Sequence, residues 1–204
     1  KARLADAVTV LAEQGGDVQG LAGDVADADH RRRMTAAVKS YGQLDLLVNN
    51  ASTLGPLPMR SMAEYELDAL RQVFEINMIA PLALVQATRP FLAASKGLVI
   101  NISSDAAVGG YDGWGGYGSS KAALDLISLT LANELREEGI SVVTVDPGDM
   151  RTTMHQDAFP GEDISDRPLP AVTMPFWAWL LGQERSAISG ERFQAQSELW
   201  QVPA

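Results

Sequence analysis

The sequence predicts an α/β fold, a doubly wound parallel sheet with helices on both faces. Helical patterns alternate with short apolar runs along all 204 residues. These runs lack the alternation of polar and apolar side chains that marks a strand with one solvated face, so we expect strands buried on both faces. No internal repeat or linker interrupts the pattern, and we therefore expect one domain over residues 1–204.

The first part of the chain predicts two helices and two apolar runs. Gly15-Gly16 ends the first helix, and Asn49-Asn50 closes the second run. Glycine and asparagine are strong turn formers, so they mark the ends of elements. In chain order we expect the helix Leu4–Gln14, the run Val18–Gly23, the helix Asp27–Tyr41 and the run Leu44–Val48.

The rest of the chain alternates in the same way around a loop rich in glycine. The glycines of this loop are Gly109, Gly110, Gly113, Gly115 and Gly116. In chain order we expect a long helix from about Met62 to Ala93, the run Leu98–Ile102, the glycine-rich loop, a helix over Tyr117–Glu138 and the run Ser141–Val145.

The segment at about 149–175 is expected to form a lid over a ligand site. It is irregular and polar between Arg151 and Met174, and three prolines interrupt it. In a compact domain, a long excursion of this kind is more often functional than a linker.

Both long helices carry apolar side chains on more than one face. A helix that covers one face of a sheet needs only one apolar stripe. The surplus favours burial against a second subunit, the alternative being a helix enclosed inside one domain. We therefore expect a homo-oligomer.

The composition narrows the classes of partner. The chain has 26 acidic and 16 basic residues, which gives a formal charge of −10. Such a field repels phosphate groups, so we expect neither nucleic acid nor an anionic membrane as a partner. The chain holds no cysteine and no apolar stretch near the roughly 20 residues that cross a bilayer. We expect a cytoplasmic protein without a metal site.

Small polar residues gather where the predicted strands end. In parallel sheets, ligands bind beyond the carboxyl ends of the strands. Any one of these groups could serve only as a turn, but four coincident ends favour a ligand site. The groups are Gly23-Asp24-Val25, Asn49-Asn50-Ala51-Ser52, Ser103-Ser104 and Asp146-Pro147-Gly148.

Tyr117 and Lys121 are candidates for proton transfer. They lie four residues apart at the start of a predicted helix, so both project from one face. A nearby ammonium favours the phenolate and lowers the pKa of a tyrosine, which lets it exchange protons with a substrate oxygen. The alternative is a half-buried tyrosine beside a solvated lysine. The preceding Ser103-Ser104 and the glycine-rich loop favour the catalytic interpretation.

Asn77 is a polar residue inside the first long helix, and Pro81 follows four positions later. Proline has no N–H, and its ring crowds the carbonyl four residues before it. We therefore expect the carbonyl of Asn77 to be available for water or another donor. The alternative is a kink with an incidental asparagine.

Together these residues resemble the classical short-chain dehydrogenases/reductases. The resemblance covers essentially the whole chain, and Ser104 precedes Tyr117 by the family's usual 13 positions. The residues that carry it are Asn-Asn-Ala-Ser at 49–52, Asn77, Ser104, Tyr117, Lys121 and Pro147-Gly148.

The resemblance implies a Rossmann-type fold and an oxidoreductase that uses NAD or NADP. Such an enzyme interconverts a secondary alcohol and a ketone or other carbonyl of a small molecule, by hydride transfer with proton transfer from tyrosine. Tyr117 would be the general acid and base, and Ser104 would stabilise the substrate oxygen. Lys121 would lower the pKa of Tyr117 and hold the nicotinamide ribose. The carbonyl of Asn77 would bind a water that continues the proton relay.

The resemblance also implies cofactor contacts and an assembly. Asp24 and Val25 would contact the adenine end, and Thr152 the carboxamide. Further cofactor contacts are implied for Asn50, Ala51, Pro147 and Gly148. The assembly would be a dimer or tetramer, and the family points to the tetramer.

We expect the substrate to lie between Tyr117, Tyr111, Trp114 and the lid. His30 and His155 are expected to be solvated, the alternative for His155 being a contact with the substrate from the lid. Trp177 and Trp179 are expected to pack in a helix or an interface, the alternative being that they line the substrate site. Ser189-Gly190 and Phe193 resemble the approach to the last strand.

Two departures from the family concern the start of the chain. Neither the glycine-rich phosphate loop nor the first two strands are found, so we expect a longer polypeptide that supplies them. Asn-Asn-Ala-Ser replaces the usual Asn-Asn-Ala-Gly. Two other functions stay open, a nucleotide-sugar epimerase or dehydratase and a non-catalytic binding protein of the same fold.

Overall fold

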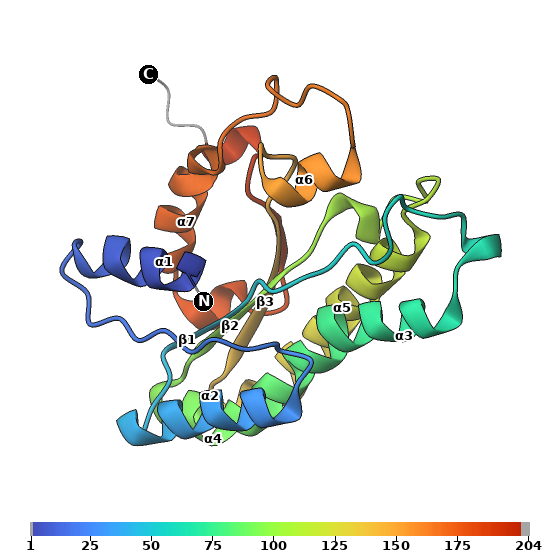
Figure 1. Ribbon diagram of the computed structural model, residues 1–204. Coiled ribbons are helices and arrows are strands. Elements are labelled where there is room, and N and C mark those ends of the chain that lie inside the picture. The colour runs from blue at the N-terminus through green and yellow to red at the C-terminus, as the bar shows by residue number, and fades with distance from the viewer. Residues whose placement is uncertain (1, 201–204) are drawn as a thin grey trace.

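The protein is built on a parallel sheet of four strands with helices on both faces. The computed structural model describes residues 2–200 (Figure 1). The strands are neighbours in chain order, β1-β2-β3-β4, and all three pairings are parallel. Their bounds are β1 Leu46–Asn49, β2 Leu98–Ile102, β3 Ser141–Asp146 and β4 Arg192–Gln194. This is the α/β architecture that the alternating pattern predicts.

Three of the predicted strands are confirmed within two residues, and β4 follows Ser189-Gly190 as expected. The prediction for Val18–Gly23 is wrong, because this run forms no strand. A strand needs a neighbour that accepts and donates its backbone hydrogen bonds. Within residues 2–200, no strand lies beside this run, and the sheet begins at β1.

The sheet separates two apolar cores. On one face, α4 (Ala80–Ser95) and α5 (Gly115–Glu134) pack against alternate residues of β2 and β3 such as Val99 and Val142. On the other face, α7 (Met174–Leu181) packs against Ile100 and Val143. The two central strands, β2 and β3, are therefore buried on both faces, as their unbroken apolar runs predict, whereas Val48 of β1 is 46% exposed.

The two N-terminal helices are α1 (Ala2–Ala12) and α2 (Ala28–Tyr41). Asp27 caps the start of α2, and Gly42 ends it in the left-handed conformation. The expectation of a solvated His30 is wrong, since His30 is 3% exposed. Its ring lies so close to Gly23 that a Cβ at that glycine would be 2.2 Å from Nδ1. His30 is therefore buried against a residue that has no side chain.

The helix predicted at 62–93 is divided in the structure. A 3₁₀ turn over Met62–Glu64 is separated from α3 (Leu67–Phe74) by the buried Tyr65. A π-helical turn over Glu75–Ile79 then leads into α4, with the N–H of Ala80 bonded to the carbonyl of Glu75. Pro81 cannot donate such a bond, which agrees with a disturbed helix around Asn77.

Helix α5 begins two residues earlier than predicted and gives way to a 3₁₀ turn over Arg136–Glu138. The segment expected as an irregular lid contains α6 (Thr153–Ala158) and a 3₁₀ turn over Pro170–Thr173. Helices α7 and α8 (Arg185–Ile188) follow. Trp177 and Trp179 pack around Phe176, which confirms a packing role for both.

No helix among residues 2–200 is both long enough and apolar enough to cross a membrane.

Candidate active site

A cavity of about 300 Å³ opens at the carboxyl ends of the strands. The ends of β1, β2 and β3 form its floor, and the starts of α5 and α6 contribute side chains to its walls. Most of the residues that the sequence singles out meet here. Those that line the cavity are Asn50, Ser104, Tyr117, Lys121, Pro147, Gly148 and Thr152.

Two serine hydroxyls, those of Ser104 and Ser52, lie beside the phenolic oxygen of Tyr117. Tyr117 is 8% exposed. Burial disfavours the phenolate and raises the pKa of Tyr117 to about 12, although the two serine hydroxyls act in the opposite direction. The expected lowering of this pKa is therefore not found in the chain by itself.

The position of Lys121 explains that difference. Its Nζ donates a hydrogen bond of 2.8 Å to the carbonyl of Ile102 and lies 5.5 Å from the centre of the Tyr117 ring. Burial penalises the ammonium and lowers the pKa of Lys121 to about 8. Nζ lies over the ring of Tyr117, and burial disfavours its positive charge. Lys121 therefore does little to lower the pKa of Tyr117, which burial raises.

Ser104 lies at the end of β2, where it caps a 3₁₀ turn over Asp105–Ala107. Its Oγ accepts the N–H of Ala106 at 3.1 Å and donates to Oδ1 of Asp105 at 3.0 Å. The cap fixes the direction of the hydroxyl, which also reaches Tyr117. Ser104 and Tyr117 thus line the same cavity, and the role of Ser104 toward a substrate oxygen stays a prediction.

Asn77 connects the loop after β1 to helix α5. Its Oδ1 accepts hydrogen bonds from the hydroxyl of Ser52 and the N–H of Thr53. Its Nδ2 donates to the carbonyl of Thr53 and to Oγ of Ser120, both at 2.9 Å. Asn77 is 1% exposed, and both its amide oxygen and its amide nitrogen are hydrogen-bonded within the chain. Asn77 therefore positions Ser52, which in turn contacts Tyr117.

Some predicted contacts do not gather at the cavity. Asp24 is exposed and accepts the N–H of Ala26, while the carbonyl of Val25 accepts from Arg31. These two residues and Ala51 are not among the residues that line the cavity. Their roles toward a cofactor stay predictions.

The lid contributes more than the sequence suggests. Thr152 caps α6, and its Oγ1 accepts the N–H of His155 at 3.2 Å. The side chain of His155 is 9% exposed and lines the cavity, so the expectation of a solvated histidine is wrong. Of the two aromatic residues expected near the substrate, Trp114 lines the cavity and Tyr111 is 51% exposed.

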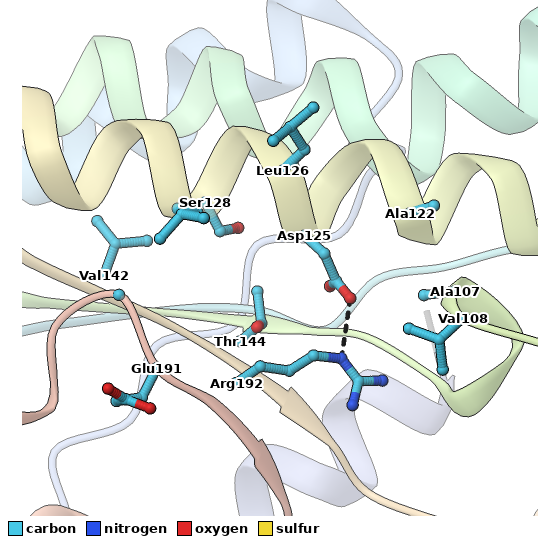
Figure 2. A pocket seen from close by; sticks show the side chains of 12 residues that line it. Ala107, Val108, Ala122, Asp125, Leu126, Ser128, Val142, Thr144, Glu191 and Arg192 are labelled. Atoms are coloured by element: carbon cyan, nitrogen blue, oxygen red, sulfur yellow. Dashed lines mark hydrogen bonds and ion pairs between the residues drawn. The ribbon is translucent and has the colours of Figure 1, made fainter.

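Arg192 of β4 is a site residue that sequence reasoning missed. Figure 2 shows its guanidinium bonded to Asp125 of α5, in a second cavity of about 340 Å³. The same guanidinium donates to the carbonyl of Ser104 at 2.9 Å and lies 3.4 Å from Oδ2 of Asp146. Nothing in the local sequence of Arg192 indicates these contacts. Sequence reasoning could have found Ser52, because it is the residue at which Asn-Asn-Ala-Ser differs from the usual Asn-Asn-Ala-Gly.

Comparison with solved structures gives close matches over almost the whole chain. A short-chain dehydrogenase of Salmonella enterica serovar Typhi superposes with a TM-score of 0.88 at 30% identity, covering 97% of this chain and 82% of that one. A short-chain dehydrogenase of Shigella flexneri complexed with NADP gives 0.88 at 29% identity, covering 97% and 83%.

Comparison with curated proteins gives the same kind of relative. The oxidoreductase YciK of Escherichia coli is 34% identical over 158 residues, covering 77% of this chain and 62% of YciK. The serine 3-dehydrogenase of Agrobacterium fabrum is 34% identical over 141 residues, covering 68% and 55%. The chain thus spans less than two thirds of the length of these relatives. The family model of the short-chain dehydrogenases matches residues 1–163, and the chain therefore belongs to that family.

Proposed function

We propose that the protein is an NAD(P)-dependent oxidoreductase that interconverts a secondary alcohol and a ketone. One observation carries the proposal: the hydroxyl of Tyr117 lies beside the hydroxyls of Ser104 and Ser52, and all three line one cavity with the buried Lys121. This is an arrangement that can give a proton to a substrate oxygen and take it back.

The donor groups at the cavity fit the nicotinamide half of such a cofactor. Lys121 and Asn50 can donate to ribose hydroxyls, and Thr152 lies near the turn of Pro147-Gly148, where a carboxamide would be held. Ser103 also lines the cavity, and its buried Oγ has no hydrogen-bond partner among the described residues. When bound, the cofactor would supply or accept the hydride. The NADP in the Shigella flexneri neighbour supports this assignment, and the choice between NAD and NADP stays open.

Tyr117 would act as the acid when a carbonyl is reduced. Its O–H bond breaks as the proton moves to the substrate oxygen, and the reverse transfer accompanies oxidation of the alcohol. A pKa of about 12 keeps the proton on Tyr117 until the substrate oxygen becomes strongly basic. Ser104 would donate a hydrogen bond to the same oxygen and stabilise its developing charge. Ser52 and Lys121 would then stabilise the phenolate that remains.

Asn77 would serve this chemistry by holding the loop that carries Ser52. The carbonyl of Asn77 is proposed to bind the water that relays protons from Lys121, as the resemblance implies. We also propose that residues 1–204 form one domain in which the segment at about 149–175 covers the substrate. Thr152 and His155 already bring this segment to the cavity.

Replacement of Tyr117 by phenylalanine tests the proposal. The ring still fills its space, but no proton can be exchanged, so we expect kcat to fall by about 10² to 10⁴ while the cofactor still binds. Tyr41→Phe is the matched control, because Tyr41 is 60% exposed and lies on α2. Retention of a tenth of the activity in Tyr117→Phe would contradict the assignment. Absence of cofactor-dependent turnover in the unaltered protein would favour a binding protein.

We further propose a homo-oligomer, as dimer or tetramer. Leu126 and Leu129 of α5 are 66% and 48% exposed, on a helix whose other faces are buried. Light scattering at micromolar concentration tests this, and a monomer would contradict it. A cytoplasmic location also stays a prediction.

A further inference from the structure

Gln196, in the segment after β4, ties that segment to a wall of the candidate active site. Its Nε2 donates hydrogen bonds to the carbonyls of Pro147 at 3.0 Å and of Asp149 at 2.9 Å. A primary amide has two N–H donors, so both are used here. Pro147 and Asp149 line the cavity of about 300 Å³, whereas Gln196 is not among the residues that line it. Gln196 therefore acts on the cavity through the turn at 147–149.

The peptide between Pro147 and Gly148 is held on both sides. Its carbonyl accepts from Gln196, and its N–H donates to Oδ1 of Asp146 at 3.0 Å. A peptide unit is planar, so a rotation that breaks one of these bonds also breaks the other. Gly148 has a φ of 72°, and a Cβ there would lie 2.6 Å from Nε2 of Gln196. Glycine thus allows both the left-handed backbone and the close approach of the amide.

The backbone that carries Gln196 is itself anchored. The N–H of Ala195, which is 2% exposed, donates to the carbonyl of Asp146 at 2.8 Å. Further along the chain, the ring of Trp200 packs on Trp179 of α7 with centroids 4.1 Å apart. These contacts fix the segment without the side chain of Gln196. The two hydrogen bonds of that side chain therefore serve the turn rather than the segment.

The turn needs such a restraint. Gly148 and Asp149 are exposed, so packing does little to fix their backbone. A glycine in an exposed turn has many accessible conformations. The bonds from Gln196 select one of them before any ligand arrives.

We propose that Gln196 is a positioning residue that holds the turn at 147–149 in the shape that receives the nicotinamide half of the cofactor. This inference rests on the proposed function, in which the carboxamide is held near Pro147-Gly148 and Thr152. Without Gln196, only a fraction of the molecules would have the turn in this shape. The cofactor would then bind more weakly, although every group that contacts it is still present.

Gln196→Met tests the proposal in the full-length protein, because methionine has a similar length but no N–H. In the protein without ligand, NMR should show the amide hydrogen of Gly148 exchanging about tenfold faster. In fluorescence titrations with NADH and NADPH, the dissociation constant of whichever cofactor the unaltered protein binds should rise about tenfold.

Gln183→Met is the matched control. Gln183 is half-buried like Gln196, and its Nε2 donates to the carbonyl of Trp179 at 3.0 Å, after the end of α7. This variant should change neither the exchange of Gly148 nor the dissociation constant. Gln196→Asn keeps the amide on a shorter side chain and should give intermediate values. If thermal unfolding shows that Gln196→Met does not fold, Gln196→Asn replaces it in the comparison.

The two measurements separate the possible failures. Unchanged exchange of Gly148 in Gln196→Met would overturn the proposal, whether or not a cofactor binds. Faster exchange with an unchanged dissociation constant would overturn the role toward the cofactor. If the unaltered protein binds neither NADH nor NADPH, the proposed function has failed, and the exchange of Gly148 alone decides whether Gln196 positions the turn.

Discussion

Arg192 donates a hydrogen bond of 2.9 Å to the backbone carbonyl of Ser104, a residue 88 positions earlier in the chain. The same guanidinium is paired with Asp125 on α5 and with Asp146 at the end of β3 (Figure 2). The backbone that carries the Ser104 hydroxyl is therefore held by the last strand of the sheet. Strand β4 therefore supports the candidate active site without lining its cavity.

We expect Arg192→Met to lower kcat by about tenfold, because loss of a charge-assisted hydrogen bond frees the loop of Ser104. Arg185→Met is the matched control, since Arg185 also donates to a backbone carbonyl, that of Lys96 at 2.8 Å. Steady-state kinetics and thermal unfolding of both variants separate the effects. Equal losses of kcat in the two variants would show that only general stability is involved.

The buried Lys121 should make stability depend on pH. Its pKa is about 8 in the folded chain against an ordinary 10.5. Between these values the unfolded chain retains a proton that the folded chain has released. The free energy of unfolding should therefore rise with pH, by up to about 1.4 kcal/mol per unit. Below pH 8 the buried charge costs stability.

Lys121→Met removes this contribution. The difference in unfolding free energy, wild type minus variant, should increase from pH 8 to pH 10. Urea denaturation at pH 8, 9 and 10 measures it, and a constant difference would contradict the assignment. Above pH 10, Tyr117 acts in the opposite direction, because its folded pKa of about 12 is raised. The titration of Tyr117 affects the wild type and Lys121→Met alike.

Asn77→Asp should destabilise the protein more at pH 7 than at pH 4.5. The new carboxylate would face the carbonyl of Thr53 and the oxygen of Ser120, where Nδ2 now donates. An uncompensated buried charge costs about 3 to 5 kcal/mol, and protonation relieves part of it. Asn133→Asp on the exposed end of α5 is the control. A loss for Asn77→Asp that does not depend on pH would contradict this account.

Gly118→Ala should reduce both stability and turnover. A Cβ at Gly118 would lie 2.5 Å from the carbonyl oxygen of Ala106, a backbone atom in the turn that Ser104 caps. Relief of this clash must move the turn, and overpacking of this kind costs about 1 to 3 kcal/mol. Gly110→Ala meets nothing within 4 Å and serves as the control. Thermal unfolding and kcat of the two variants decide the matter, and indistinguishable behaviour would contradict the prediction.

The sheet could be predicted because its central strands are apolar on both faces. The run Leu98–Ile102 coincides with β2. The run Val18–Gly23 failed because strand formation also requires a neighbouring strand, and the composition of one segment contains no information on its neighbours. The prediction of one continuous helix from about Met62 was wrong at Tyr65, because the burial of Tyr65 against Gly55 and Gly116 depends on tertiary packing.

The core of the candidate site was also predictable, because Tyr117 and Lys121 lie four residues apart on one helix, and the family resemblance pointed to Ser104. Both histidines were misplaced. His30 packs against Gly23, which has no side chain to exclude it, and the ring of His155 packs against Phe159. Burial of this kind depends on packing that polarity and local pattern do not encode.

The π-helical turn at Glu75–Ile79 requires a fixed number of residues between α3 and α4. A π turn accommodates one residue more than an α turn, and one residue corresponds to about 100° of rotation around the helix axis. Deletion of a single residue here would restore a regular helix but turn α3 out of phase with α4. Asn77 would then face away from either Thr53 or Ser120. Gaps in alignments of distant relatives should therefore fall outside residues 75–79.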